Sequence, residues 1–253
     1  RSETLGTRIG SFDNPDKAAA DESNRRQFDE AMDVIQLALT EERFSYHGEV
    51  YDLPPPGIPD RGGTVQELTL VPRPLHPFET WQAITSPPTL EQVPRRGWGG
   101  VFWNNHPTFT KRNWDRFAEV FEEVHGRTLE PGEKRTLVRC VCVADTREEA
   151  MARVRPGHDE MWKFLGPYGW SKGYMGPDGK PAKAGLIPSL EESLEQKIWI
   201  VGSPDDVGQQ IQWYRDLLGV ENLLLFPMMP GDSYKAGEEQ VHRLAADVLP
   251  KFD

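Results

Sequence analysis

Four short apolar runs, each separated from the next by a helix-forming segment, constrain the fold of this 253-residue chain more than any other feature. The runs read TWQAIT, GGVFW, TLVRCVCVA and NLLLFPMM. The third is almost continuously apolar, as in strands that are buried on both faces. Strands that alternate with helices are joined by right-handed crossovers, which align them in parallel. We therefore predict an α/β fold with a parallel sheet.

The segments outside these runs predict helices and turns. From Phe28 the apolar residues fall on one helical face. A hairpin-like excursion, RFSYHGEVYDL, and a proline-rich loop follow this helix. Between the first two strands only a short helix fits, because Pro94 interrupts it and Gly97 ends it. We expect the helix that starts at Arg147 to weaken at Pro156.

Residues 166–185 read GPYGWSKGYMGPDGKPAKAG and have no apolar periodicity. Loops of this length in compact domains are usually functional or disordered. We predict a long mobile loop around Lys172. A lid over a binding site and a solvated linker both explain this composition.

The number of strands limits how much of a barrel is present. A complete eight-stranded β/α barrel takes about 250 residues. This chain has that length but offers only four convincing buried strands. We therefore expect residues 1–253 to form a single domain that corresponds to the C-terminal part of a β/α barrel.

The composition argues against several classes of function. The net charge is -11, the pI is about 5.1, and the basic residues are dispersed, which disfavours nucleic acid and anionic membranes as partners. No run approaches the roughly 18 apolar residues that a membrane span needs, and the N-terminus has no signal-peptide core. We expect a cytoplasmic protein with a small-molecule partner.

Metal and disulfide sites are not indicated either. Cys140 and Cys142 lie two residues apart on a strand, and such neighbours rarely form a bridge. Two cysteines make no zinc site, and the six histidines have no metal-ligand spacing. No serine lies in a nucleophile-elbow pattern, so a serine hydrolase is not supported.

Two helices begin with Ser-Pro, and both starts are candidates for anion binding because phosphate commonly lies at a helix N-terminus in β/α barrels. At Ser203 the first turn carries Asp205 and Asp206, whose charges favour the helix dipole and repel an anion. A capping role explains this start.

The start at Ser86 is different, because its first turn is neutral and offers the hydroxyl groups of Thr85, Ser86 and Thr89. A phosphate could be accepted there. Pro87 and Pro88 weaken that interpretation, since neither has an amide proton to donate. Helix capping and phosphate binding therefore both stay open at this point.

Two aromatic residues lie where strands end. Trp103, followed by Asn104 and Asn105, ends the second strand, and Phe226 ends the fourth. In a β/α barrel these positions point toward the mouth, where aromatic rings could form the walls of a pocket for a planar ligand. Both residues could equally be ordinary core aromatics.

The order of these pieces resembles the luciferase-like flavin monooxygenases, the family of bacterial luciferase and the alkanesulfonate monooxygenases. The resemblance runs almost end to end and rests on an initial Arg followed by TLGTRIG, then RRQFDEAMDVIQLAL, ERFSYHGEVYDL, WQAITSPPTLEQVPRRGWGG, VADTREEA with its preceding strand, the long loop, VGSPDDVGQQIQWYRDLLGVENLLLF and LAADVLPKFD. Each piece alone is a weak signal, but together and in this order they are specific.

The resemblance implies a β/α barrel that binds FMN, usually as reduced flavin delivered by a separate flavin reductase. It implies that Thr85, Ser86 and Thr89 bind the flavin phosphate together with Arg1, and that the loop around Lys172 shields the flavin from water. Dioxygen and a small organic substrate would be the partners in the reaction, in a homo- or heterodimer. The resemblance leaves the catalytic residues unknown. Trp103 and Phe226 would form walls of the substrate pocket.

Two departures from the family pattern leave alternatives open. The position of Thr85 is often acidic in the family, and the resemblance starts only after the fourth barrel strand, so an N-terminal portion is expected elsewhere. A deazaflavin-dependent dehydrogenase of the same superfamily is the nearest alternative. A non-catalytic flavin-binding subunit is the second, and a β/α protein whose Ser86 turn is only a helix cap is the third.

Overall fold

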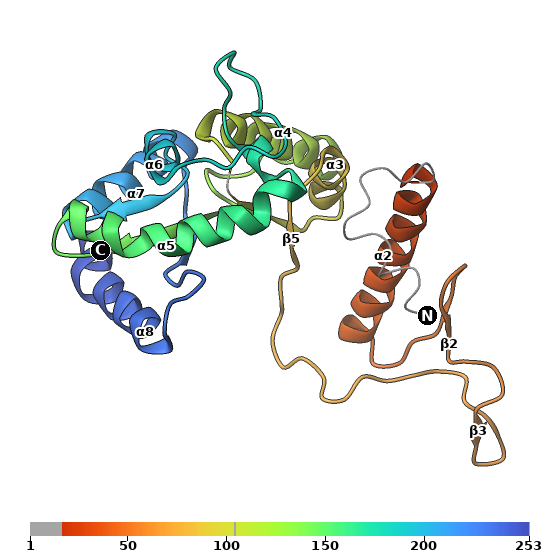
Figure 1. Cartoon of the computed structure of the whole chain (residues 1–253). Helices are drawn as coiled ribbons and strands as arrows, with labels where there is room; N and C mark the ends of the chain where they lie inside the picture. The colour runs from red at the N-terminus through yellow and green to blue at the C-terminus, as the bar shows by residue number, and fades with distance from the viewer. Residues whose placement is uncertain (1–16, 104, 253) are drawn as a thin grey trace. The chain divides into compact units, whose positions relative to one another are not determined.

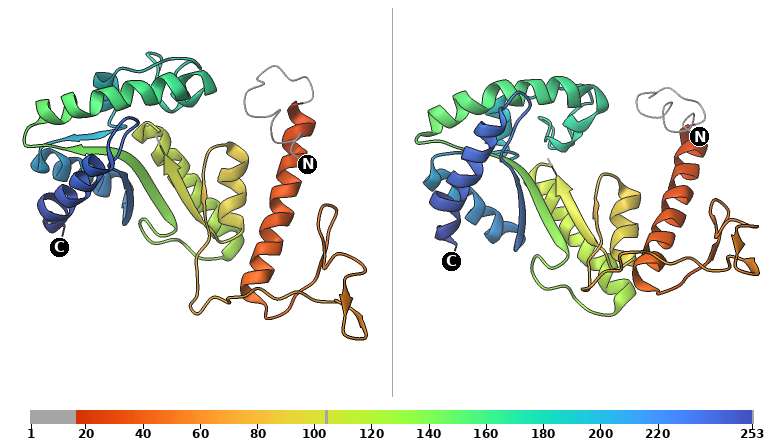
Figure 2. Two further views of the ribbon diagram at one scale, coloured as in Figure 1. Left: turned by 60° about the horizontal axis from the view of Figure 1, so that its bottom comes forward. Right: turned by 90° about the horizontal axis from the view of Figure 1, so that it is seen from below.

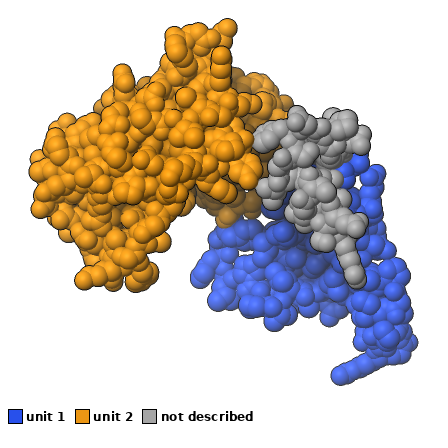
Figure 3. Space-filling view, in the orientation of Figure 1, with its two compact units in different colours: residues 1–78 blue, residues 79–253 orange. Residues whose placement is uncertain are grey.

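A computed structural model describes residues 17–103 and 105–252. The chain divides into two compact units, residues 1–78 and 79–253, which Figure 3 distinguishes by colour. Each unit is described separately below. The expectation of a single domain stays a prediction.

The first unit joins a long helix to two small hairpins. Helix α2 spans Lys17–Thr40, strands β1 (Tyr46–His47) and β2 (Asp52–Leu53) pair antiparallel, and so do β3 (Pro59–Asp60) and β4 (Gly63–Thr64). The carboxylate of Glu30 accepts hydrogen bonds from the backbone amides of residues 49, 50 and 51, at 3.0, 2.9 and 3.2 Å. These bonds lower the pKa of Glu30 and fix the first hairpin to the helix. The predicted helix and hairpin are confirmed.

The second unit is built on a parallel sheet (Figures 1 and 2). Its strands are β5 (Trp81–Ala83), β6 (Gly99–Trp103), β7 (Arg135–Val143), β8 (Ile200–Gly202) and β9 (Asn222–Phe226). The long strand β7 is central, because β6 pairs with its residues 135–138, β9 with 136–140 and β8 with 141–143. All four predicted strands are confirmed, and the short strand β8 is an addition. Within the described residues the sheet is open.

Helices follow the strands in the predicted alternation. They are α3 (Pro87–Arg95), α4 (Pro107–His125), α5 (Arg147–Leu165), α6 (Leu190–Glu195), α7 (Pro204–Leu218) and α8 (Tyr234–Arg243), with short helical turns over residues 244–251. Helix α3 packs on α4 and β6, α5 packs on β7 and β8, and α7 packs on β8. This alternation of parallel strands and helices confirms the predicted α/β class.

The core of this unit surrounds β7, all nine residues of which are buried. Beside it lie fully buried aromatic residues such as Trp162, Trp199 and Phe102, and the rings of Phe102 and Trp114 are 5.3 Å apart. Cys140 and Cys142 are buried free thiols, and burial raises the pKa of Cys140 to about 12. At neutral pH this thiol is protonated and behaves as a small apolar side chain.

One of two helices departs from the predicted effect of proline. Pro156 lies inside α5, which continues to Leu165, whereas α3 is short as predicted and ends at Arg95, directly after Pro94. Packing explains the first case, because Val154 and Trp162 on either side of the proline are buried. Tertiary burial of one helical face outweighs the loss of one backbone hydrogen bond.

The loop 166–185 also has more structure than its composition predicts. It contains two 3-10 turns, Gly166–Tyr168 and Trp170–Gly173, followed by a bridge between Met175 and Pro181. Residues 177–181 are exposed in the part of the loop that projects from the rest of the unit (Figure 1, teal), whereas Ser171, Gly173, Tyr174 and Ala182 are buried. The first half of the loop is therefore packed against the rest of the second unit.

Candidate functional site

A cavity of about 540 Å³ lies where β5 and β6 end, between the start of α3, the first turns of α4 and the loop 166–185. The carboxyl ends of parallel strands are where α/β proteins bind ligands, because the loops that follow the strands meet there. The residues that matter for its chemistry are Thr85, Ser86, Trp103, Asn105, Arg112, Tyr168, Trp170 and Lys172. All of them belong to the second unit.

The charges at this cavity are of one sign. Arg112 and Lys172 line it, and no aspartate or glutamate is among the described residues that line it. The chain as a whole carries a net charge of -11, so a cavity with two cations and no acid is a local exception. Such a site favours an anionic ligand, because a bound negative charge meets attraction and no repulsion from its lining.

The turn at the start of α3 is a capping box made of hydroxyl groups. Ser86 is the N-cap, and Thr89 Oγ1 accepts hydrogen bonds from the amides of Thr85 and Ser86, at 3.2 and 3.1 Å. Thr89 Oγ1 also donates to the carbonyl of Ser86 at 2.8 Å. The hydroxyl of Thr89 therefore holds the turn together. Since Pro87 and Pro88 have no amide proton, the donors left for a ligand are the hydroxyls of Thr85 and Ser86.

Three other capping boxes in the second unit are acidic. Thr146 pairs with Glu149, Ser189 with Glu192 and Ser203 with Asp206. The predicted cap at Ser203 is confirmed, with the amide of Asp206 donating to Ser203 Oγ at 3.2 Å. A carboxylate in the first turn satisfies the helix dipole itself and repels an anion, whereas the α3 turn leaves the dipole unneutralised.

Aromatic rings form one wall of the cavity. The rings of Trp103 and Trp170 meet edge to face, with their centroids 5.1 Å apart. The ring of Phe226 also contacts Trp103, at a centroid distance of 6.4 Å. Phe226 is 52% exposed and supports Trp103 without being one of the cavity residues. Trp103 Nε1 is buried and has no hydrogen-bond partner among the described residues. Two flat apolar faces beside a cationic end suit a planar ligand with an anionic tail.

The structure brings together most of the predicted site. Thr85, Ser86 and Trp103 line one cavity, Thr89 orders its turn, and Phe226 packs behind. Arg1 lies outside the described residues. Sequence reasoning missed Arg112, because a cation on an amphipathic helix looks like any solvated residue until the helix is placed in space.

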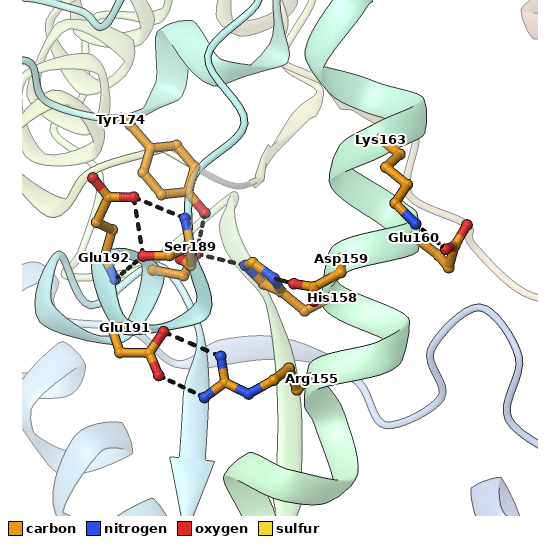
Figure 4. A network of polar contacts seen from close by, with 10 residues as sticks. Arg155, His158, Asp159, Glu160, Lys163, Tyr174, Ser189, Glu191 and Glu192 are labelled. Atoms are coloured by element: carbon orange, nitrogen blue, oxygen red, sulfur yellow. Dashed lines mark hydrogen bonds and ion pairs between the residues drawn. The ribbon is translucent and has the colours of Figure 1, made fainter.

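A buried polar network joins α5, α6 and the loop 166–185 (Figure 4). Tyr174 Oη is 2.7 Å from Ser193 Oγ, which is 2.8 Å from His158 Nε2, and His158 Nδ1 is 3.0 Å from Asp159 Oδ1. The order resembles a nucleophile, a base and a carboxylate. However, Ser193 and His158 are fully buried, and neither lines the cavity. A substrate cannot reach Ser193, so this network gives no support to a hydrolase.

Two searches of the described residues bear on other functions. Within residues 17–103 and 105–252, no group of three or more His, Cys, Asp or Glu side chains is placed to hold a metal ion. In the same part of the chain, no helix combines the length and apolar character that crossing a bilayer requires.

The fold and the cavity define an α/β protein of the β/α-barrel kind with a site at the carboxyl ends of its strands. The chain belongs to the luciferase-like monooxygenase family, whose profile matches residues 7–221. The expected family and fold class are thereby confirmed. A search among curated proteins found no match.

Solved structures support the fold. The oxygenating constituent of 3,6-diketocamphane monooxygenase from Pseudomonas putida, in complex with FMN, matches 88% of this chain at 20% identity and a TM-score of 0.67. The monooxygenase RslO1 from Streptomyces bottropensis matches 94% at 16% identity and a TM-score of 0.68. The coenzyme F420 dependent tetrahydromethanopterin reductase from Methanopyrus kandleri matches 90% at 14% identity and a TM-score of 0.57.

This chain spans 62%, 66% and 63% of the length of those three structures. Their cofactors differ, since one is solved with FMN and another depends on coenzyme F420. The similarity therefore establishes the fold and the family, and the cofactor has to be argued from this chain's own residues.

Proposed function

We propose that the protein is an FMN-dependent monooxygenase, which uses reduced flavin and dioxygen to oxygenate a small organic substrate. The observation that carries this proposal is the composition of the cavity, whose described lining combines Arg112 and Lys172 with the hydroxyl turn at Ser86 and the ring of Trp103 and includes no acid. A phosphorylated, planar ligand matches these three features in one site. The family membership supports the same conclusion.

The donor set fits the phosphate of FMN. Hydroxyls of Thr85 and Ser86 would donate to its oxygens, Arg112 and Lys172 would balance its charge, and Thr89 would keep the turn in shape. Following the family resemblance, we also propose Arg1 as a phosphate ligand. FMN would supply the redox chemistry when bound, while the protein orients it and excludes water.

Trp103 and Trp170 would cover the flavin ring on one side. Among the described residues that line the cavity, the cationic side chains are Arg112 and Lys172, and none is a carboxylate, thiol or imidazole. This lining therefore supplies positive charge and offers no carboxylate or imidazole as a general base. We propose binding, orientation and shielding as its roles, with a flavin reductase, dioxygen and a dimeric state as further parts of the proposal.

Coenzyme F420 is a second candidate cofactor, because one similar structure depends on it. Both cofactors are planar and carry phosphate, so the cavity's charge alone does not separate them. In that case the reaction would be hydride transfer without dioxygen. The absorption spectrum of any cofactor that copurifies with the protein distinguishes these two reactions.

Ligand titration tests the proposal and is the first prediction. Under anaerobic conditions reduced FMN should bind saturably, and riboflavin, which lacks the phosphate, should bind at least about tenfold more weakly. Arg112→Gln should reduce the difference between the two flavins, since it removes a phosphate partner. Lys111→Gln is the matched control, because Lys111 pairs with Asp115 at 2.6 Å and does not line the cavity.

Mixing the reduced FMN complex with isotopically labelled dioxygen tests the chemistry. A monooxygenase places one labelled oxygen atom in the organic product. Saturable binding without consumption of dioxygen would favour hydride transfer, and equal affinity for FMN and riboflavin would contradict a phosphate site.

A further inference from the structure

One wall of the cavity is a segment with few internal bonds of its own. Residues 166–174 contribute Tyr168, Trp170 and Lys172 to the lining and consist of two 3-10 turns. Such turns are stabilised weakly by local hydrogen bonds, and long loops open easily unless other elements hold them. Contacts from outside the segment must therefore define this wall.

The first of these contacts is the side chain of Tyr174, at the end of the segment. Tyr174 is fully buried, its ring meets Trp162 of α5 edge to face at 5.0 Å, and its hydroxyl forms a hydrogen bond with Ser193 Oγ at 2.7 Å. Burial raises the pKa of Tyr174, so this hydroxyl keeps its proton near neutral pH. The hydrogen bond joins the segment to α6.

The second contact lies one residue further on. Gln196 Oε1 accepts from the amide of Met175 at 2.8 Å, and Gln196 Nε2 donates to the carbonyl of Met175 at 3.1 Å. One side chain thus satisfies both backbone groups of Met175, as a neighbouring strand would. Ser193 and Gln196 are three positions apart at the end of α6, so they lie on the same side of the helix.

Ser193 is itself held from two directions. Its hydroxyl proton has two acceptors within reach, the carbonyl of Ser189 at 2.9 Å and His158 Nε2 at 2.8 Å. Helix α6 is also tied to α5 through Arg155 and Glu191, whose side chains are 2.5 Å apart (Figure 4). The support for the segment therefore reaches back to the core helix α5.

We infer that Ser193 and Gln196 are positioning residues for the ligand cavity, because they fix Tyr174 and Met175 and thereby hold segment 166–174 in place as a wall. The anchoring is independent of the ligand, whereas its effect on flavin binding rests on the proposed function. Neither residue touches the cavity, so both act through the segment that they hold.

Amide hydrogen exchange, resolved by peptide, tests the anchoring without any ligand. Ser193→Ala and Tyr174→Phe should each speed exchange in residues 166–175 about tenfold, while the peptides of β7 keep their rates, since one hydrogen bond is lost locally. Gln196→Ala should act on the same peptides. Trypsin cleavage after the exposed Lys172 should accelerate in parallel.

Thr136→Val is the matched control. Thr136 is also buried and its hydroxyl donates to the carbonyl of Asn222 at 2.8 Å, but that bond joins two strands. This variant should lower overall stability without a selective effect on residues 166–175. Two results would overturn the inference. One is fast amide exchange of residues 166–175 already in the unchanged protein. The other is an exchange rate that rises uniformly across the second unit in both Ser193→Ala and Tyr174→Phe.

Measuring FMN binding separates the anchoring inference from the proposed function. If reduced FMN binds, Ser193→Ala should raise its dissociation rate several-fold and leave the association rate nearly unchanged, because the wall closes behind the ligand. If the unchanged protein does not bind FMN while the variants still release the segment selectively, the anchoring inference stands and the proposed function fails.

Discussion

The starts of α3 and α7 have the same sequence pattern and opposite chemistry. Each begins with a serine N-cap followed by proline, and each has a reciprocal capping box with the third helical residue. That residue is Thr89 in α3 and Asp206 in α7. Ser86 faces the cavity, whereas Ser203 Oγ donates to the Asp206 carboxylate at 2.9 Å.

This difference shows that capping and anion binding are separate properties of a helix start. Capping needs an oxygen at the right place, and a hydroxyl or a carboxylate supplies it equally well. Anion binding needs the positive end of the dipole to stay unneutralised, which a carboxylate prevents. The first turn of α3 is neutral, whereas the first turn of α7 carries Asp205 and Asp206.

Placing an acid at the third position of α3 should have the largest effect. Thr89→Glu keeps a capping box at α3 but places a negative charge beside the proposed phosphate, so the affinity for reduced FMN should fall at least tenfold, which corresponds to about 1.4 kcal/mol. Thermal stability should be nearly unchanged. Titration and a thermal melt measure the two quantities.

Asp206→Thr is the converse control, because it removes one of the two acids in the first turn of α7, which does not line the cavity. It should leave FMN affinity unchanged and cost a few tenths of a kcal/mol in stability. If Thr89→Glu binds FMN as tightly as the unchanged protein, the α3 turn is only a helix cap.

Removing the two serine hydroxyls should have an intermediate effect. Ser86→Ala and Ser203→Ala should each cost about 1 kcal/mol of unfolding free energy, since each loses an N-cap. Only Ser86→Ala should also lower the affinity for reduced FMN, by several-fold, while the affinity for riboflavin changes little. Urea unfolding and the two titrations, compared between the variants, check this. Equal FMN affinity in both variants would refute a ligand role for Ser86.

The effect that is smallest at neutral pH is the loss of stability in acid. The α3 turn from Thr85 to Thr89 has no ionisable side chain, whereas the opposite wall is anchored near His158. Burial lowers the pKa of His158 despite the nearby Asp159, and the pair Arg155 and Glu191 completes its charged surroundings. Burial lowers the pKa of His106 as well.

A lowered pKa means that the unfolded chain binds protons that the folded protein excludes. Stability is therefore complete above about pH 6.5 and decreases as the pH falls below it, by at most about 1.4 kcal/mol per pH unit for each histidine. Urea unfolding at a series of pH values measures the slope. His158→Asn should reduce that slope, and an unchanged slope would show that His158 does not contribute.

The wall segment and the helices show where sequence patterns fail. Residues 166–174 lack periodicity, so they predict a mobile loop, yet Tyr174 and Ser171 are buried. Their partners, Ser193 and Lys183, are 19 and 12 positions away in the sequence. Local patterns contain no information about such pairs. Pro156 failed as a helix breaker for a similar reason, since distant residues pack around α5 and compensate for the missing bond.

The sequence by itself determined the elements and their order. Apolar runs and helical spacing report burial and local geometry, which are properties of neighbouring residues, so β5, β6, β7, β9 and the capped helix starts could be predicted. The hydroxyls at Thr85, Ser86 and Thr89 and the ring of Trp103 were also recognisable as site candidates.

Only the tertiary structure decided what these residues do together. It placed Arg112 and Lys172, which are 60 positions apart in the chain, in one cavity whose described lining includes no acid. It assigned Thr89 to holding the turn and Phe226 to supporting Trp103. The physical reason is that charge and shape at a site are sums over residues distant in sequence, and these residues meet only when the sheet and its loops are folded.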